Sequence, residues 1–290
     1  MSGDGEDKDH AEQAAREWVA ARTRPGNWYD IAPAEEIPRR VEPDLFIVLQ
    51  MFQFRFAPEI RRRLSEGRID HRFVLHMAQF VQRDDAPPEI RLNQEIRGNA
   101  AVRAQRAVSR GDQVYLADLV DVQGFDLDPD EMDAGHCTLF RTTSGQWRVF
   151  FDFRMRRREV GQLLDIAAEF LAVAKASLES GHNRSSVDAL FTACEHVAKA
   201  HLILHHHSHL RSSKGHGATH SAINLWSQMG NVEEGFTKLF NQLFAERNPA
   251  KYDTDVEVTP PSDEDLALID AEIQALRASI ASRVAPAAGR

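Results

Sequence analysis

The chain has 290 residues, of which 42% are hydrophobic and 27% charged, a composition that excludes a wholly disordered chain or a fibre. Its formal net charge of -9 excludes a general nucleic-acid coat protein, because such proteins bind phosphate with an excess of positive charge. We expect no membrane span, since no apolar run approaches the roughly 20 residues required, and no secretory signal, since the N-terminus is acidic and polar. The two cysteines, Cys137 and Cys194, form no CxxC pair, and these features together favour a cytoplasmic location.

The first part of the chain predicts an α+β domain of unknown role at residues 25–157, preceded by a polar, flexible segment at residues 1–24. Residues 44–82 predict helices. The run DLFIVLQMFQFRF is apolar almost throughout, so it predicts a segment buried on most sides, either as a helix or as a strand. PEIRRRLSEG predicts a helix that Gly67 closes, and HRFVLHMAQFVQ predicts a further amphipathic helix.

A small antiparallel sheet is expected after these helices. Residues 110–153 are rich in β-branched and aromatic side chains, and two apolar runs flank the turn signal at Ser144 and Gly145, which predicts a β-hairpin. His136 and Cys137 are neighbours on the first of these strands and therefore point to opposite faces, so they are not a catalytic pair. Earlier in the chain, an i, i+3, i+7 spacing predicts one helix face for Arg103, Arg106 and Arg110.

Residues 158–285 predict an all-α antiparallel bundle of four or five helices. The predicted buried stripe of the first helix is Leu163, Ile166, Phe170, Ala174 and Leu178. The second helix is expected to begin after an N-cap at Asn183 and to bury Val187, Leu190, Phe191, Cys194, Val197, Ala198 and His201. Two more helices are predicted in THSAINLWSQMGN and VEEGFTKLFNQLFAER, and Ser262 is expected to cap the last one.

Three parts of this bundle resemble the HEPN domain. They are the amphipathic helix that leads into NRSSVDALFTACEHVAKAHLIL, a histidine-bearing loop, and the segment FTKLFNQLFAERNPAKYD, which is similar to the arginine-containing helix end of that family. The resemblance covers residues 160–284, and none is found for residues 1–155. It implies an all-helical fold that typically dimerises and acts in prokaryotic toxin–antitoxin and defence systems.

The resemblance also implies a site. Active members of the family cleave RNA without a metal, using an arginine, a polar residue and, a few residues later, a histidine. Arg247 matches the arginine, Asn248 matches the polar residue, and Tyr252 stands where a histidine could be. Arginine is suited to hold phosphate, but a tyrosine hydroxyl ionises well above neutral pH and is a weak general base there. The resemblance therefore implies binding of RNA or a nucleotide through these three residues, with Arg247 and Tyr252 as the catalytic pair if RNA is cleaved.

Arg184 is a further candidate for a binding residue. It lies in the first turn of its predicted helix, where a cation opposes the helix dipole. This local cost predicts a tertiary partner. The partner is either a carboxylate of the bundle, such as Asp188, Glu246 or Asp253, or an anionic ligand.

Eight of the 13 histidines fall within residues 196–220. His216 or His220 could swing into the site and replace the missing histidine of the motif. The i, i+4 pairs His201/His205 and His216/His220 have a spacing that a metal can use. No third ligand with suitable geometry is evident, so we expect no metal and no other cofactor. His201 is expected to pack inside the bundle.

The sequence thus favours a HEPN-like protein of defence or toxin type that binds RNA or a nucleotide, with metal-independent RNA cleavage as an open question. The alternative is a non-catalytic dimeric scaffold whose N-terminal domain recognises a protein or a small ligand. A metal-dependent hydrolase built on the histidines is a more distant alternative. The expected partners are a second copy of the chain bound through the bundle, RNA or a nucleotide, and a separately encoded protein. No P-loop, GxGxxG, GxSxG or HExxH motif is present.

Overall fold

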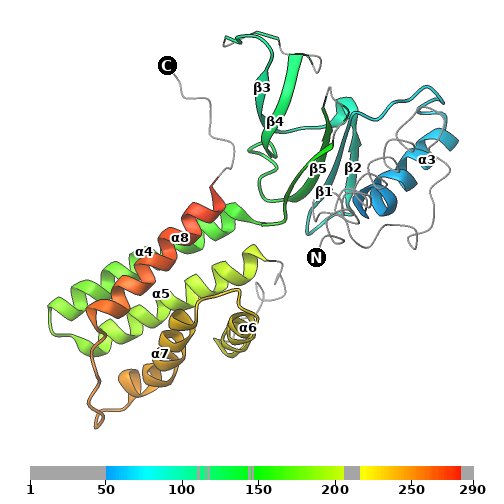
Figure 1. The fold of residues 1–290 in the computed structure, drawn as a ribbon. Helices are drawn as coiled ribbons and strands as arrows, with labels where there is room; N and C mark the ends of the chain where they lie inside the picture. Colours follow the sequence, from blue (N-terminus) through cyan, green and yellow to red (C-terminus); the bar gives the residue numbers. More distant parts are fainter. Residues whose placement is uncertain are drawn as a thin grey trace, which may run out of the picture. The chain divides into compact units, whose positions relative to one another are not determined.

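The computed structural model describes residues 50–109, 112–113, 115, 118–142, 145, 147–205 and 216–281. The chain divides into two compact units, with the division between Phe153 and Arg154 (Figure 1). The first unit contains helices and antiparallel strands and the second is helical, so the predicted fold class is confirmed. No helix in the described residues is long and apolar enough to cross a membrane. The predicted flexible segment at residues 1–24 lies outside the described residues.

The N-terminal unit contains a four-stranded antiparallel sheet in the order β2-β1-β5-β6. The strands are β1 (Met77–Gln82), β2 (Glu89–Leu92), β5 (Gly135–Arg141) and β6 (Trp147–Asp152). A short 3-10 turn, η3 (Asn93–Glu95), follows β2. Strands β3 (Asn99–Ala104) and β4 (Leu119–Asp126) form a separate two-stranded ribbon. The pairing of β5 with β6 confirms the predicted hairpin, and Gly145 between them has a φ of +84°.

The two faces of the sheet are buried by different elements. The π-helical turn η2 (Phe52–Phe56) and helix α3 (Ala57–Ser65) cover one face, in a cluster that contains Phe52, Phe56, Ile60, Leu75, Ala78, Phe80, Leu92, Cys137 and Leu139. Residues of β4 and the segment after it pack on the other face, in a cluster that contains Val81, Val122, Phe125, Leu127, Ala134 and Phe140. The ring of His136 contacts Phe125, whereas Cys137 lies in the first cluster, so the two neighbours point to opposite faces as expected.

Two expectations for this unit are wrong. Residues 77–82 form a strand and not a helix, because β1 lies between β2 and β5 and is buried on both faces. Such a strand is apolar nearly throughout, and its pattern does not distinguish it from a buried helix. Arg103 lies on strand β3 and Arg106 follows that strand, so the two do not share a helix face; Arg110 lies outside the described residues. The predicted end of α3 is confirmed, because Gly67 has a φ of +69° just after it.

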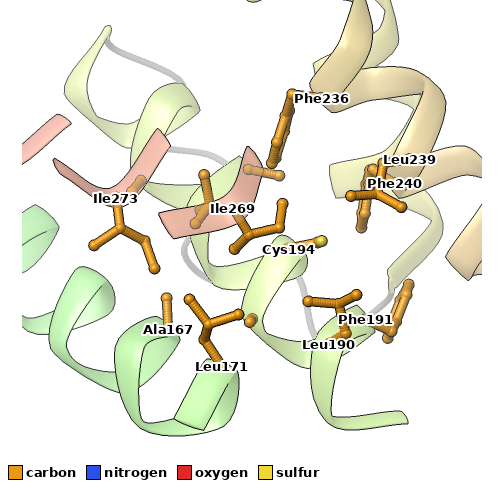
Figure 2. Close-up of a cluster of buried hydrophobic side chains, with 14 of the residues drawn as sticks. Ala167, Leu171, Leu190, Phe191, Cys194, Phe236, Leu239, Phe240, Ile269 and Ile273 are labelled. Carbon is orange, nitrogen blue, oxygen red and sulfur yellow. The ribbon is translucent and has the colours of Figure 1, made fainter. Parts of the chain in front are cut away.

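In the described residues of the C-terminal unit, five helices form a bundle. They are α4 (Arg157–Glu179), α5 (Asn183–Leu204), α6 (His216–Gln228), α7 (Glu234–Tyr252) and α8 (Asp263–Ile280). Helix α5 packs against each of the other four, and Figure 2 shows its side chains Leu190, Phe191 and Cys194 among residues of α4, α7 and α8. The side-chain hydroxyl of Ser262 accepts a hydrogen bond from the amide of Asp265, which confirms the predicted cap of α8.

The stripe predicted for α5 is buried, apart from His201, which is partly exposed. The stripe predicted for α4 is only partly correct. Ile166 and Phe170 are each 37% exposed, and the buried positions are Val160, Leu164, Ala167, Leu171 and Ala174. Helix α4 is apolar over more than one face, so its pattern alone does not select the face that meets α5. Asn183 is the first helical residue of α5 and not its N-cap, which is His182.

Candidate functional site

Helix α7 sets the position of the motif residues. It continues through Pro249 and ends at Tyr252, so Arg247 is not at its end. At 3.6 residues per turn, Arg247 and Tyr252 lie about 140° apart around the helix, whereas Arg247 and Lys251 lie one turn apart. The structure therefore places Arg247 with Lys251, and Asn248 with Tyr252, on two different faces of α7.

Arg247 and Lys251 both bind one carboxylate of α5, that of Asp188. Arg247 Nε donates to Asp188 Oδ1 over 3.0 Å, and Lys251 Nζ donates to Asp188 Oδ2 over 2.9 Å. The guanidinium carbon of Arg247 also lies 4.7 Å from the centre of the Phe191 ring, which favours a cation on that face. We call Arg247, Lys251 and Asp188 the Asp188 cluster. It holds two cations and one carboxylate.

The charge state of Asp188 follows from this arrangement. Partial burial acts to raise the pKa of the Asp188 carboxyl, but hydrogen bonds from Lys251 and Arg247 outweigh burial and hold this pKa below its ordinary value. Asp188 is therefore an anion at neutral pH. The three side chains of the cluster are 22% to 39% exposed, so a ligand in solution can reach them.

Arg184 binds main-chain oxygens and not the carboxylates that the sequence suggested. Its guanidinium donates to the carbonyls of Ala250 and Asp253, over 2.9 and 2.7 Å, and to that of Val256 over 2.6 Å, with a longer bond to Pro249. The last carbonyls of a helix have no partner within the helix. Arg184 thus caps the end of α7 and fastens the segment after it to the start of α5.

Two hollows lie beside these residues. One, of about 630 Å³, is lined by Asn248, Pro249, Tyr252, Asp253 and Thr254. Tyr252 is 77% exposed there. The other, of about 850 Å³, is lined by residues 181–185 and 256–260, which include Arg184.

His220 belongs to an aromatic cluster next to Arg247. Its ring stacks on Phe244 with 4.3 Å between the ring centres, and Phe244 contacts the same Phe191 ring that Arg247 covers. The His216 main chain begins α6, but its side chain lies outside the described residues. His201 bonds Glu272 within the bundle, as expected. In the part of the chain that the structure describes, no group of three or more His, Cys, Asp and Glu residues could hold a metal ion.

The sequence identifies Arg247, Asn248 and Tyr252 as candidates. It did not reveal Lys251, nor that Asp188 is the carboxylate shared by Arg247 and Lys251. The i, i+4 spacing of Arg247 and Lys251 was a usable signal, because residues at that spacing share a helix face. The sequence predicts the end of this helix near Arg247, whereas α7 continues to Tyr252.

Comparison with known proteins places a family match in the C-terminal unit. The model of the HEPN domain matches residues 160–272, a range that contains Arg184 and the whole Asp188 cluster. No curated protein matches the chain. The C-terminal helical unit of this chain therefore carries a HEPN domain.

Proposed function

We propose that the HEPN domain binds RNA through phosphate contacts at the Asp188 cluster. The observation that carries this proposal is that an arginine and a lysine, 22% and 39% exposed, meet at one carboxylate on the surface of the bundle. Arginine and lysine at such a position are the usual donors to phosphate.

Asn248 and Tyr252 extend this site around α7. They line the hollow on the next face of the helix, where an amide and a phenol can donate hydrogen bonds to a second phosphate or stack with a base. One phosphate group does not reach both faces of the helix. This arrangement favours a strand of several nucleotides over a single nucleotide, and it assigns Arg247 and Tyr252 to different parts of the ligand.

RNA cleavage requires in addition a proton carrier near neutral pH. Tyr252 lies on the wrong face of α7 to act on a phosphate held by Arg247. His220 is the better candidate, because it lies in the aromatic cluster on which Arg247 rests. We therefore propose that the main function is RNA binding. For RNA cleavage, we propose His220 as the proton carrier. A homodimer formed through the bundle, a defence role and a separately encoded partner are proposed from the HEPN resemblance alone.

The test is binding and cleavage of a mixed-sequence RNA in EDTA, for the wild type and the variants Arg247→Ala, Lys251→Ala and His220→Ala. We expect the first two variants to lose about tenfold in affinity and to lower the slope of log K against log salt by about one. Loss of cleavage in His220→Ala with affinity retained would assign the proton transfer to His220.

The matched control is Arg277→Ala. Arg277 of α8 is also a surface arginine of the bundle paired with a carboxylate, that of Asp165, but it lies outside the site. The Arg277→Ala variant should bind RNA with the same affinity as the wild type. If the wild type binds no RNA at low salt, the proposal is wrong and the non-catalytic scaffold is favoured.

A further inference from the structure

The position of Asp188 between two cations resembles that of a bound anion. Its Oδ1 accepts hydrogen bonds from both Arg247 and Lys251, and its Oδ2 accepts one from Lys251. Two oxygens of a phosphate group would be bound in the same manner. The carboxylate thus occupies the place that a phosphate needs.

Resting on the proposed function, we propose that Asp188 is an internal competitor of the ligand, which weakens phosphate binding at Arg247 and Lys251 and limits it to polyanions. A ligand phosphate must either displace the Asp188 carboxylate or bind beside it. In both cases the negative charge of Asp188 lies within a few ångströms of the negative phosphate. At this distance the repulsion between partly exposed charges is substantial.

The local structure allows this displacement. Asp188 lies in the second turn of α5, and its side chain is about one-third exposed, so the carboxylate can turn toward water without moving the helix. Arg247 is supported independently by the ring of Phe191. Arg184 holds the end of α7, where Lys251 lies, through main-chain carbonyls. The two cations therefore do not depend on Asp188 alone for their positions.

The test uses the full chain and a 12-nucleotide RNA that carries 2′-O-methyl groups, so that no 2′-hydroxyl can attack, in EDTA at several salt concentrations. We expect Asp188→Asn to bind this RNA about tenfold more tightly than the wild type, because one repelling charge is removed. We also expect the slope of log K against log salt to become steeper by about 0.7, the value for one more neutralised phosphate of a single strand.

The matched control is Asp165→Asn. Asp165 is also a carboxylate of the bundle, paired with Arg277, and its substitution changes the net charge by the same amount. An equal gain in Asp165→Asn would overturn the inference, because a change in overall charge would then explain the effect.

The remaining outcomes separate the two proposals. Equal or weaker binding by Asp188→Asn than by the wild type would show that Asp188 only positions the cations, which overturns this inference and leaves RNA binding intact. No binding by either protein would overturn RNA binding itself. Circular dichroism checks the fold, and Asp188→Ser replaces Asp188→Asn if the latter loses its helices. Loss of helices in both would also overturn the inference, because the carboxylate would then be required for the fold.

Discussion

Arg91 in the N-terminal unit and Arg247 in the C-terminal unit are both paired with carboxylates, yet their surroundings differ. Arg91 is 3% exposed and donates to Glu131 over 2.6 and 2.7 Å and to Glu89 over 2.7 and 3.0 Å. Arg83 bonds the same two carboxylates, so this network holds two cations and two anions. In the Asp188 cluster, Arg247 and Lys251 share one carboxylate, and all three side chains are partly exposed.

The difference lies in how deeply the arginine is buried, because the side chain of Arg91 is 4% exposed and that of Arg247 is 22% exposed. In the N-terminal network, hydrogen bonds from Arg91 and Arg83 outweigh partial burial and hold the pKa of Glu89 at about 2, and the network has no net charge left to attract a ligand. A buried arginine that is bonded to carboxylates in this way organises a fold. An arginine and a lysine that are partly exposed can bind an anion from solution. The number of ion pairs does not distinguish the structural role of Arg91 from the proposed binding role of Arg247.

The largest expected effect follows from removing Arg91. The substitution Arg91→Met leaves Glu131 and Glu89 without their main partner at the sheet, and we expect a loss of about 3–5 kcal/mol in the stability of the N-terminal unit. Hydrogen exchange of β1 and β2 measures this loss. RNA binding by the bundle should not change. Arg148→Met serves as control, because Arg148 pairs with Asp121 at the surface of the same unit; similar losses in both variants would remove the contrast.

An intermediate effect is expected for Arg184, which binds main-chain acceptors and belongs to neither kind of network. The substitution Arg184→Ala removes the side-chain donor to the carbonyls of Ala250, Asp253 and Val256. We expect a loss of about 1–3 kcal/mol in the stability of the bundle, measured by thermal unfolding. Arg184→Lys should recover less than half of this loss, because a single ammonium group cannot replace the fork of a guanidinium. Full recovery by lysine would show that charge alone matters at this position.

The smallest effect concerns acid stability. Because the folded-state pKa of Asp188 is lowered, its ionisation stabilises the fold at pH values above the ordinary aspartate pKa of about 3.9. This contribution is lost as the pH falls through the folded-state value. We expect the wild type to exceed Asp188→Asn in stability by less than about 1 kcal/mol at pH 7, because the pair is solvent-screened. The difference should vanish near pH 2; a difference that grows in acid would contradict this assignment.

The fold was predictable where one face of an element is apolar and the other polar. The capped start of α8 is of this kind. Helix α5 is buried on more than one face, and it was predictable from its length and its apolar spacing. Strand β1 was not, because it is buried on both faces. The register of α4 was not either, because Ile166 and Phe170 compete with Leu164 and Leu171 for the inner face, and only the position of α5 decides between them.

The sequence could indicate which side chains belong to the candidate site, but it could not indicate their main-chain partners. Arg247 follows from the HEPN resemblance, which a family match now supports. The partners of Arg184 could not be predicted, because every residue has a main-chain carbonyl and the residue type does not show which of them accepts a hydrogen bond. The separation of Arg247 from Tyr252 required knowledge that α7 continues beyond Pro249.

Pro249 also has a consequence for the order of folding. A proline has no amide hydrogen, so the carbonyl four residues earlier, that of Ala245, lacks its usual partner and the helix is weakened at this point. The turn after it is held by Arg184 from α5, which binds the carbonyls of Pro249, Ala250 and Asp253. The last turn of α7 therefore depends on contacts with a residue far away in the sequence, and not only on hydrogen bonds within the helix. We expect it to form late, after α5 and α7 have met, and the turn that carries Lys251 to be completed by the same event.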